Sequence, residues 1–196
     1  QELGLPVATT VMGKGAVAET HPLSVGVVGY FMAPGARAAH QRELIAEADV
    51  VLLIGNRTNQ NGTDSWSLYP EGARYIHIDI DGGEIGRNYE ALRLKGDARL
   101  VLSQLCEALE AQDLSAIHTR RPALETRIGE GRAAHEREIE GLIDWDAAPI
   151  RPERLMRDLD TVLPEDAVTV ADASYSSIWI ANGLTARRAG QRFLTP

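Results

Sequence analysis

The segment 49–55, an aspartate followed by five apolar residues and a glycine, constrains the fold more than any other part of the sequence. An apolar run without polar alternation is typical of a strand in a parallel sheet, because helices cover both faces of such a sheet. A second strand is indicated at 73–81, and a short extended stretch at 92–96. We therefore expect a parallel sheet in which strand 49–55 is buried on both faces.

Helical patterns alternate with these strands. Pro34 suits the first turn of a helix over 34–48, and Asp97 suits the N-cap of a helix over 98–111. Another strand is expected at 6–10. Strands that alternate with helices predict an α/β fold, here a Rossmann-like open parallel sheet flanked by helices with right-handed connections.

The segment 114–142 differs in character, because its large apolar residues are few and charges fill the rest. This pattern indicates an exposed helix that packs lightly. We place a helical connector at 113–149 and assign 1–112 to a domain that lacks its first strand.

A β-α-β pattern follows in 150–196. It is expected to hold helices over 152–162 and 175–182, the latter capped by Ser174 and closed by Gly183, a buried strand over 167–172 and a strand that starts at Arg192. So short a unit cannot enclose a core of its own. We therefore expect 150–196 to be the first piece of a larger domain.

The charge balance excludes two classes of partner. The chain has 28 acidic and 20 basic side chains, a formal charge of −8. Sequence-independent nucleic-acid binding and attachment to anionic membranes both need a basic surface, and no apolar run reaches the roughly 18 residues of a membrane span. A single cysteine cannot form an internal disulfide, which suits the cytoplasm. We expect a cytoplasmic protein with no nucleic-acid or membrane partner.

The common catalytic signatures are absent from the sequence. Gly13, Lys14 and Gly15 are followed by alanine and do not continue into a phosphate-binding P-loop, and the five histidines lack the spacing of metal ligands. We expect neither catalytic residues nor a metal site in this chain.

The turns after the strands are the remaining candidates for a ligand-binding site, because ligands of open parallel sheets bind beyond the carboxyl ends of the strands. Gly55 permits close approach of a ligand to the backbone, Arg57 can hold a phosphate, and Asp79 can accept a hydrogen bond from a ribose hydroxyl. The alternative, that these are only the turns every α/β domain needs, fits the residues equally well.

Four segments that include these turns resemble the central domain of thiamine-diphosphate-dependent enzymes, in particular acetolactate synthase and its relatives. Their order and spacing agree with that family over 5–109, and the segments are 9–26, 48–57, 76–86 and 96–98. The stretches 170–179 and 193–195 resemble the opening of the family's C-terminal, cofactor-binding domain. The resemblance thus covers nearly the whole chain outside the connector.

This resemblance implies a three-domain parent enzyme that decarboxylates or joins 2-keto acids with thiamine diphosphate and Mg²⁺. The family's general base, a glutamate on the first domain, and its Mg²⁺-binding Gly-Asp-Gly motif, later in the third, are not in this sequence. The chain is therefore expected to be an inactive fragment. Its implied partners are the rest of the parent chain and further copies in a homodimer or homotetramer.

A nucleotide site is also implied, because acetolactate synthases bind FAD in this domain, whereas relatives bind ADP or nothing there. The residues that match FAD-contacting positions are Thr10, Val11, Met12, Val28, Gly29, Gly55, Arg57, Asp79, Ile80 and Asp97. This chain departs from the FAD binders at two places: Asn61 stands where they have an arginine, and Tyr30 and Phe31 replace a Met-His pair. FAD and ADP therefore both stay open.

A second cofactor-binding segment follows strand 167–172. In the family this turn meets the diphosphate of the cofactor, which implies that role for Ala173, Ser174, Tyr175 and Ser176. A helix N-terminus favours anions, and serine hydroxyls add donors. The alternative is that Ser174 only caps the helix.

Two alternatives to the enzyme fragment stay open. One is a free-standing nucleotide-binding module, and the other is a structural scaffold for the parent dimer with an empty pocket. Binding of FAD or ADP by this chain would separate them.

Overall fold

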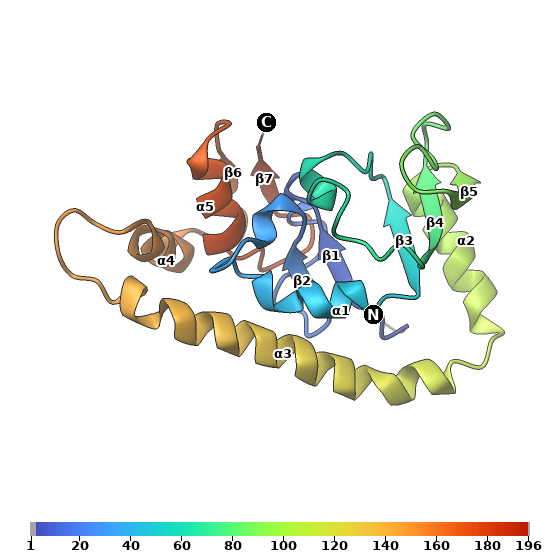
Figure 1. Cartoon of the computed structure of the whole chain (residues 1–196), viewed down its shortest axis with the longest axis horizontal. Helices are drawn as coiled ribbons and strands as arrows, with labels where there is room; N and C mark the ends of the chain where they lie inside the picture. The colour runs from blue at the N-terminus through green and yellow to red at the C-terminus, as the bar shows by residue number, and fades with distance from the viewer. Residues whose placement is uncertain (1–2, 196) are drawn as a thin grey trace.

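The computed structural model describes residues 3–195 (Figure 1). Residues 1–2 and 196, which belong to the first and last expected segments, lie outside the described part. The strands are β1 (Val7–Thr9), β2 (Ser24–Val27), β3 (Val50–Ile54), β4 (Arg74–Asp79), β5 (Ala91–Lys95), β6 (Val168–Val170) and β7 (Arg192–Leu194). The α-helices are α1 (Arg42–Ala46), α2 (Ala98–Glu110), α3 (Ser115–Ile143), α4 (Pro152–Val162) and α5 (Tyr175–Gly183), and the short 3₁₀ helices are η1 (Val11–Gly13), η2 (Tyr30–Met32), η3 (Ala39–Gln41) and η4 (Asn61–Thr63).

Every strand pair in residues 3–195 is parallel. β3, β4 and β5 form one sheet in sequence order, with Ile54 opposite Ile78 and Ile78 opposite Leu94. β1 pairs with β2, and β6 pairs with β7. Helices flank these strands, which confirms the predicted α/β class (Figure 1). Within it, the strands fall into three hydrogen-bonded groups.

The sequence pattern does not predict β2, although all four of its residues are buried. Val7 pairs with Ser24 and Ala8 with Gly26, so the register shifts by one residue between them. A strand of four residues that contains a serine and a glycine has neither an apolar run nor a period to detect.

The strand at 50–54 is less buried than its composition predicts. Leu53 is 3% exposed, but Val50 is 39% and Ile54 is 42% exposed. Burial on both faces is therefore wrong for the described chain. In this part of the chain α2 packs against β4, and the face that holds Val50 and Ile54 keeps solvent contact.

The helix expected over 34–48 is also shorter than predicted. Pro34 lies in a turn, in which the Ala36 N–H donates to the Ala33 carbonyl at 2.9 Å. Gly35 adopts φ +82°, which is outside the helical region. The helical path starts only with η3 and continues into α1.

Helix α3 crosses the molecule from below α2 to α4 (Figure 1). It forms where the helical connector was expected, and it contains Pro122. Only Ile128, Gly131, His135 and Ile143 of this helix are buried, so most of it is exposed or half-buried as expected. The exception is the stretch around Ile128, which is fully buried in a core cluster with Leu23, Val28 and Met32. The Gln41 side-chain amide donates to the Ile128 carbonyl at 3.0 Å. The middle of helix α3, around Ile128, therefore belongs to the core.

Helix α4 has the predicted bounds, and Ser174 caps α5 as predicted by accepting from the Ser176 N–H at 3.1 Å. The predicted role of Gly183 is wrong, because it is the last residue of α5 and Leu184 is the C-cap. A Cβ at Gly183 would lie 2.4 Å from the Met156 Cβ. This glycine therefore lets α5 approach α4 closely.

Strand β6 is exposed where the sequence predicts a buried strand. Val168 is 55% and Val170 is 70% exposed. β6 pairs with β7 alone, and no helix of residues 3–195 covers the face that holds both valines.

Candidate functional site

The carboxyl edge of the three-stranded sheet brings together three of the predicted residues. The Gly55 N–H donates to the Ile78 carbonyl at 2.9 Å, and the Gly96 N–H donates to the Asp79 carbonyl at 3.0 Å. Gly55, Asp79 and Asp97 therefore lie at or just after the carboxyl ends of adjacent strands, at one edge of the sheet. A Cβ built on Gly55 would meet no atom within 4 Å, so this edge is open.

The side chains at this edge are partly engaged. One oxygen of Asp79 accepts from the Asp81 N–H at 2.9 Å. Asp97 accepts from the first N–H groups of α2, which confirms its predicted capping. Arg57 is exposed, and Ile80 is 71% exposed. The Arg57 guanidinium and the backbone at Gly55 are thus the parts of this edge that a ligand can reach.

A second set of predicted residues lies at the ends of β1 and β2. Thr10, Val11 and Met12 follow β1, while Val28 and Gly29 follow β2. The Val28 N–H donates to the Thr9 carbonyl at 2.8 Å, and the Val28 side chain is 2% exposed. Its side chain is therefore a core group, and only its backbone faces the edge.

The chain's own loop approaches Gly29 closely. A Cβ at Gly29 would lie 2.2 Å from the Asn61 carbonyl oxygen, and one at Gly62 would lie 3.0 Å from the Thr10 Cγ2. This is the loop in which the sequence departs from the FAD binders. Its fold is fixed locally, because the Asn88 amide donates at 2.9 Å to both the carbonyl and the hydroxyl oxygen of Thr58.

The predicted diphosphate segment, Ala173 to Ser176, is exposed at the start of α5, and Tyr175 is 79% exposed. The hydroxyl oxygens of Ser174 and Ser176 lie 2.7 Å apart, and Ser176 also donates to the Asp172 carbonyl at 3.2 Å. In the described chain the two serine hydroxyls thus form hydrogen bonds with each other and with the Asp172 carbonyl. Both hydroxyls are exposed and can rotate toward a ligand.

Two of the three sets lie near each other. The Thr195 hydroxyl lies 3.3 Å from the Met12 sulfur, and the Ala171 N–H donates to the Leu194 carbonyl at 2.9 Å. The end of β7 therefore lies between Met12 and the turn that starts at Asp172.

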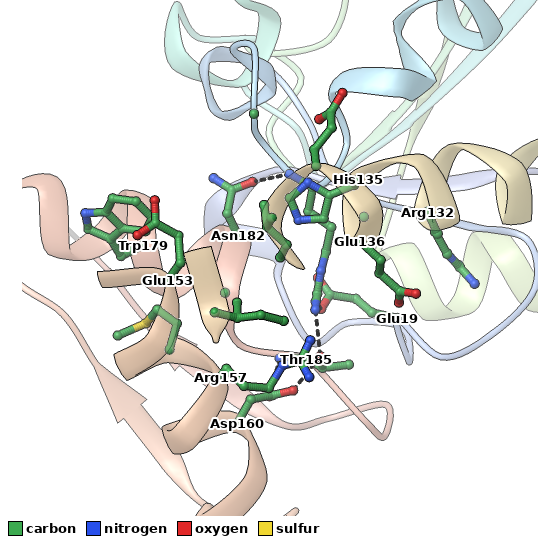
Figure 2. A pocket seen from close by; sticks show the side chains of 18 of the residues that line it. Glu19, Arg132, His135, Glu136, Glu153, Arg157, Asp160, Trp179, Asn182 and Thr185 are labelled. Carbon is green, nitrogen blue, oxygen red and sulfur yellow. Dashed lines mark hydrogen bonds and ion pairs between the residues drawn. The ribbon is translucent and has the colours of Figure 1, made fainter. Parts of the chain in front are cut away.

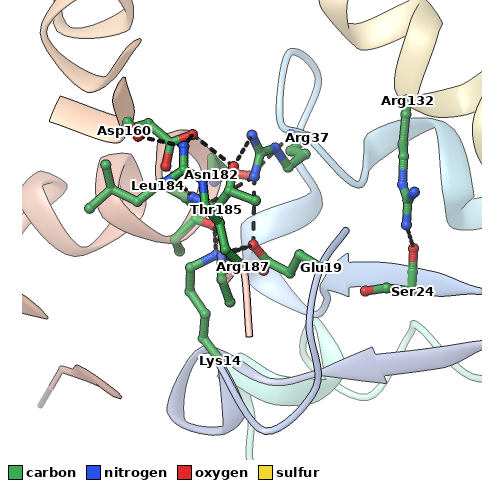
Figure 3. Close-up of polar contacts among 12 residues, drawn as sticks. Lys14, Glu19, Ser24, Arg37, Arg132, Asp160, Asn182, Leu184, Thr185 and Arg187 are labelled. Carbon is green, nitrogen blue, oxygen red and sulfur yellow. Dashed lines mark hydrogen bonds and ion pairs between the residues drawn. The ribbon is translucent and has the colours of Figure 1, made fainter. Parts of the chain in front are cut away.

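The sequence pattern missed a buried ion pair. The Lys14 ammonium lies 2.6 and 2.7 Å from the two Glu19 oxygens and also donates to the Ala181 carbonyl at 3.1 Å (Figure 3). The side chains are 1% and 5% exposed. Burial lowers the pKa of Lys14 from 10.5 to about 8, and the Glu19 carboxylate opposes this shift. The sequence feature that could have indicated this pair is Lys14 between two glycines, which the sequence analysis used only to exclude a phosphate-binding P-loop.

This pair continues into a network that joins the first and last parts of the chain. The Ala186 N–H donates to Glu19 at 2.9 Å, and the Arg37 guanidinium donates to the Thr185 hydroxyl at 3.0 Å. The Thr185 N–H in turn donates to the Asp160 carboxylate at 2.7 Å. We call these residues the interunit network: Lys14, Glu19, Arg37, Asp160, Thr185 and Arg187 (Figure 3).

A cavity of about 500 Å³ lies beside this network, between β2, α3, α4 and α5 (Figure 2). None of the predicted site residues lines it. Its nearest strand residues are Ser24, Val25 and Gly26, at the start of β2. The cavity is therefore separate from the carboxyl edges that the sequence indicates.

Within residues 3–195, no three His, Cys, Asp or Glu side chains gather as metal ligands. No helix in this part of the chain is long and apolar enough to cross a membrane.

Comparison with known proteins gives a family match for residues 1–105, to the model described as thiamine pyrophosphate enzyme, central domain. The chain is 36% identical over 185 residues to a probable acetolactate synthase large subunit of Methanocaldococcus jannaschii, an alignment of 91% of this chain and 29% of that protein. It is 30% identical to a putative acetolactate synthase large subunit of Mycobacterium tuberculosis, over 100% of this chain and 33% of that protein.

A third relative has a different name. A sulfoacetaldehyde acetyltransferase of Alcaligenes xylosoxydans xylosoxydans is 34% identical over 148 residues, which are 72% of this chain and 23% of that protein. The chain thus spans no more than about a third of the length of these relatives.

Proposed function

Because this chain belongs to the thiamine-pyrophosphate enzymes, through their central domain, we propose that it is a non-catalytic part of an acetolactate-synthase-like enzyme that acts on 2-keto acids. The observation that carries the proposal is the family match over 1–105 together with relatives that align along nearly the whole chain. In this proposal 1–112 is the central domain, 113–149 the connector and 150–196 the start of the cofactor-binding domain. The parent assembles as a homodimer or homotetramer in the cytoplasm.

Thiamine diphosphate, when bound, supplies the ring that stabilises the carbanion left by decarboxylation. The residues of this chain fit the holding of its diphosphate, because the start of α5 presents exposed hydroxyls beside a helix N-terminus. Ser174 and Ser176 would donate to diphosphate oxygens, with Ala173 and Tyr175 beside them. We assign Mg²⁺ to none of the described residues, since no ligand group gathers among them.

The central domain of this chain is proposed to bind a nucleotide, FAD or ADP, at the carboxyl edge of the three-stranded sheet. Gly55 leaves room for it, Arg57 supplies a cation, and Asp79 supplies a carboxylate. A ligand that extends toward Thr10, Met12 and Gly29 would meet the loop at Asn61, so that loop must move for it. The shorter ADP needs less of this rearrangement.

A second candidate function is a structural scaffold without a nucleotide. The observation that favours it is the Asn61 carbonyl, which already occupies the close approach to Gly29. A free-standing nucleotide-binding module is the third candidate, and it needs tight binding by this chain alone.

Isothermal titration of the chain with ADP and with FAD tests these candidates. We expect ADP binding that Arg57→Ala weakens about tenfold or more, because a guanidinium grips phosphate through charge-assisted hydrogen bonds. The matched control is Arg74→Ala, an exposed arginine at the opposite end of β4. Equal losses in both variants would remove Arg57 from the site, and no binding by the wild type would favour the scaffold.

A further inference from the structure

The loop after β3 contains strained backbone. Within residues 3–195, every non-glycine residue with a positive φ lies in this loop: Thr58 at +49°, Asp64 at +51°, Ser65 at +56° and Trp66 at +62°. The left-handed conformation is unfavourable for β-branched and bulky side chains, and it normally occurs at single residues rather than in runs. Such strain persists only where the surroundings impose it, and it is concentrated at ligand clamps and switch segments. We call 58–66 the clamp loop.

Side chains hold the clamp loop in this conformation. The Trp66 indole N–H donates to the Thr58 carbonyl at 3.0 Å, which joins the two ends of the loop directly. The Arg42 guanidinium binds the Asp64 carboxylate at 2.5 Å and also donates to the Met32 carbonyl at 3.1 Å. Arg42 therefore ties the clamp loop to η2.

The clamp loop covers part of the predicted nucleotide site. Gly29 is buried, and a Cβ on it would lie 2.2 Å from the Asn61 carbonyl oxygen. Gly62 packs on Thr10, since a Cβ on Gly62 would lie 3.0 Å from the Thr10 Cγ2. A Cβ on Gly55, in contrast, would meet nothing within 4 Å. A ligand thus reaches Gly55 freely but meets the clamp loop before Gly29.

Two opposing effects decide whether the clamp loop stays closed. Opening would release the left-handed backbone, but it would break the hydrogen bond of Trp66 and the ion pair of Arg42. Ser65 is exposed and Trp66 is 49% exposed, so little side-chain packing opposes a change of the backbone there. When opposing effects nearly balance, a small change in either one shifts the populations of the two states.

We propose that the clamp loop selects the length of the nucleotide that this domain binds, an inference that rests on the proposed nucleotide function. The closed loop admits ADP at the edge formed by Gly55, Arg57 and Asp79. FAD is longer, extends toward Thr10 and Gly29, and binds only when the loop is open. The free energy of opening therefore weakens the binding of FAD and leaves that of ADP unchanged.

Substitutions of Ser65 shift the opening equilibrium without touching the nucleotide site. The Ser65 side chain is exposed, and its hydroxyl accepts from the Gln60 amide at 3.4 Å. Ser65→Ala removes this contact and serves as the reference. Ser65→Val adds a β-branch, which disfavours a positive φ and so favours opening, whereas Ser65→Gly permits a positive φ and so favours closure.

Isothermal titration of the three variants with ADP and with FAD tests the selection. Relative to Ser65→Ala, we expect FAD affinity to rise about threefold or more in Ser65→Val and to fall about threefold or more in Ser65→Gly. ADP affinity should be equal in all three. Equal FAD affinity in the variants, or FAD binding by none of them, overturns the selection. If ADP still binds, only the selection fails, and if neither ligand binds, the nucleotide function fails with it.

Amide hydrogen exchange measures opening of the clamp loop without any ligand. The Leu68 N–H donates to the Thr63 carbonyl at 3.0 Å and reports on the loop. Its exchange should be faster in Ser65→Val and slower in Ser65→Gly than in Ser65→Ala. The Gly96 N–H, which donates to the Asp79 carbonyl at 3.0 Å, is the control and should exchange equally in all three. Equal exchange at Leu68 in the three variants overturns the proposal.

Discussion

The most apolar strand of this protein is not its most buried one. β3 consists of five large apolar residues, yet two of them are about 40% exposed, at 39% and 42%. β2 contains a serine and a glycine, yet all four of its residues are buried. The difference lies in what covers each strand. Helix α3 and the core cluster around Ile128 cover β2, whereas one face of β3 stays open.

The region around β2 and the sheet of β3, β4 and β5 also differ in how far their charged groups are buried. Around β2 the interunit network buries an ammonium and a carboxylate together. At the sheet of β3, β4 and β5, Arg57, Asp97 and other charged residues stay in solvent, although the His77 imidazole of β4 is buried. Stability should therefore depend more strongly on individual charged groups in the first region than in the second.

The largest effect is expected at the buried pair. Lys14→Met removes the ammonium and leaves the Glu19 carboxylate buried, with Arg37 at 3.6 Å as the remaining cation. Breaking such a pair costs about 3–5 kcal/mol. Urea unfolding measures the change, and Arg127→Gln, which breaks an exposed pair with Glu47, is the control that should leave stability unchanged. Equal losses of stability in Lys14→Met and Arg127→Gln would contradict the view that buried charged pairs matter more here than exposed ones.

The pH dependence of stability provides a second test of the same pair. The pKa of Lys14 is about 8 in the folded chain and 10.5 as a free side chain, so above pH 8 the unfolded chain holds more protons. The free energy of unfolding of the wild type should then rise with pH relative to Lys14→Met, by at most about 1.4 kcal/mol per pH unit.

The measurement belongs between pH 7.5 and about 9.5, below the titration of the tyrosines. Burial raises the pKa of Tyr69 to about 12, and this shift reduces stability once pH passes about 10. A difference between wild type and variant that stays flat or falls over this window would show that Lys14 has no lowered pKa.

A third test concerns α3, whose glycines differ in surroundings. A Cβ at Gly131 would lie 2.3 Å from the Gln41 amide nitrogen, whereas one at Gly129 would meet nothing within 4 Å. Gly131→Ala should cost about 1–3 kcal/mol by overpacking, while Gly129→Ala should be stabilising by about 0.5–1 kcal/mol. Thermal melting compares the two, and similar melting temperatures would mean that α3 does not pack on η3 as described.

The smallest effect is expected on the open face of β3. Ile54→Thr keeps a β-branched side chain at a position that is 42% exposed and should change stability by no more than about 0.5 kcal/mol. Its neighbour Leu53 is 3% exposed, and Leu53→Ala should cost about 2–5 kcal/mol. A large loss in Ile54→Thr would mean that a further surface covers this face in solution.

The contrast also explains which elements the sequence could predict. β4, α2 with its Asp97 cap, α4 and the Ser174 cap are local patterns of period, propensity and hydrogen bonding, and they form as predicted. β2 and the burial of α3 depend on contacts between distant segments. Their residues show no period, so the sequence alone could not reveal them.

The candidate sites also differ in whether local sequence patterns or tertiary packing bring their residues together. Residues at the ends of β3, β4 and β5 were found because parallel strands deliver their carboxyl ends to one edge, and Gly55, Asp79 and Asp97 do lie there. The pairing of Lys14 with Glu19 and the placing of His135 in a cavity follow from tertiary packing alone. The roles of Gly55, Asp79 and Asp97 as binding residues remain predictions.

The burial of Ile128 has a consequence for dividing the chain. A truncated chain that stops at residue 112 would contain every strand of the proposed central domain, but it would lose the side chain that fills the cluster around Leu23 and Met32. Such a truncation would leave a hole in the core and expose apolar surface that favours aggregation. A graft between relatives therefore has to carry α3 together with the strands it covers.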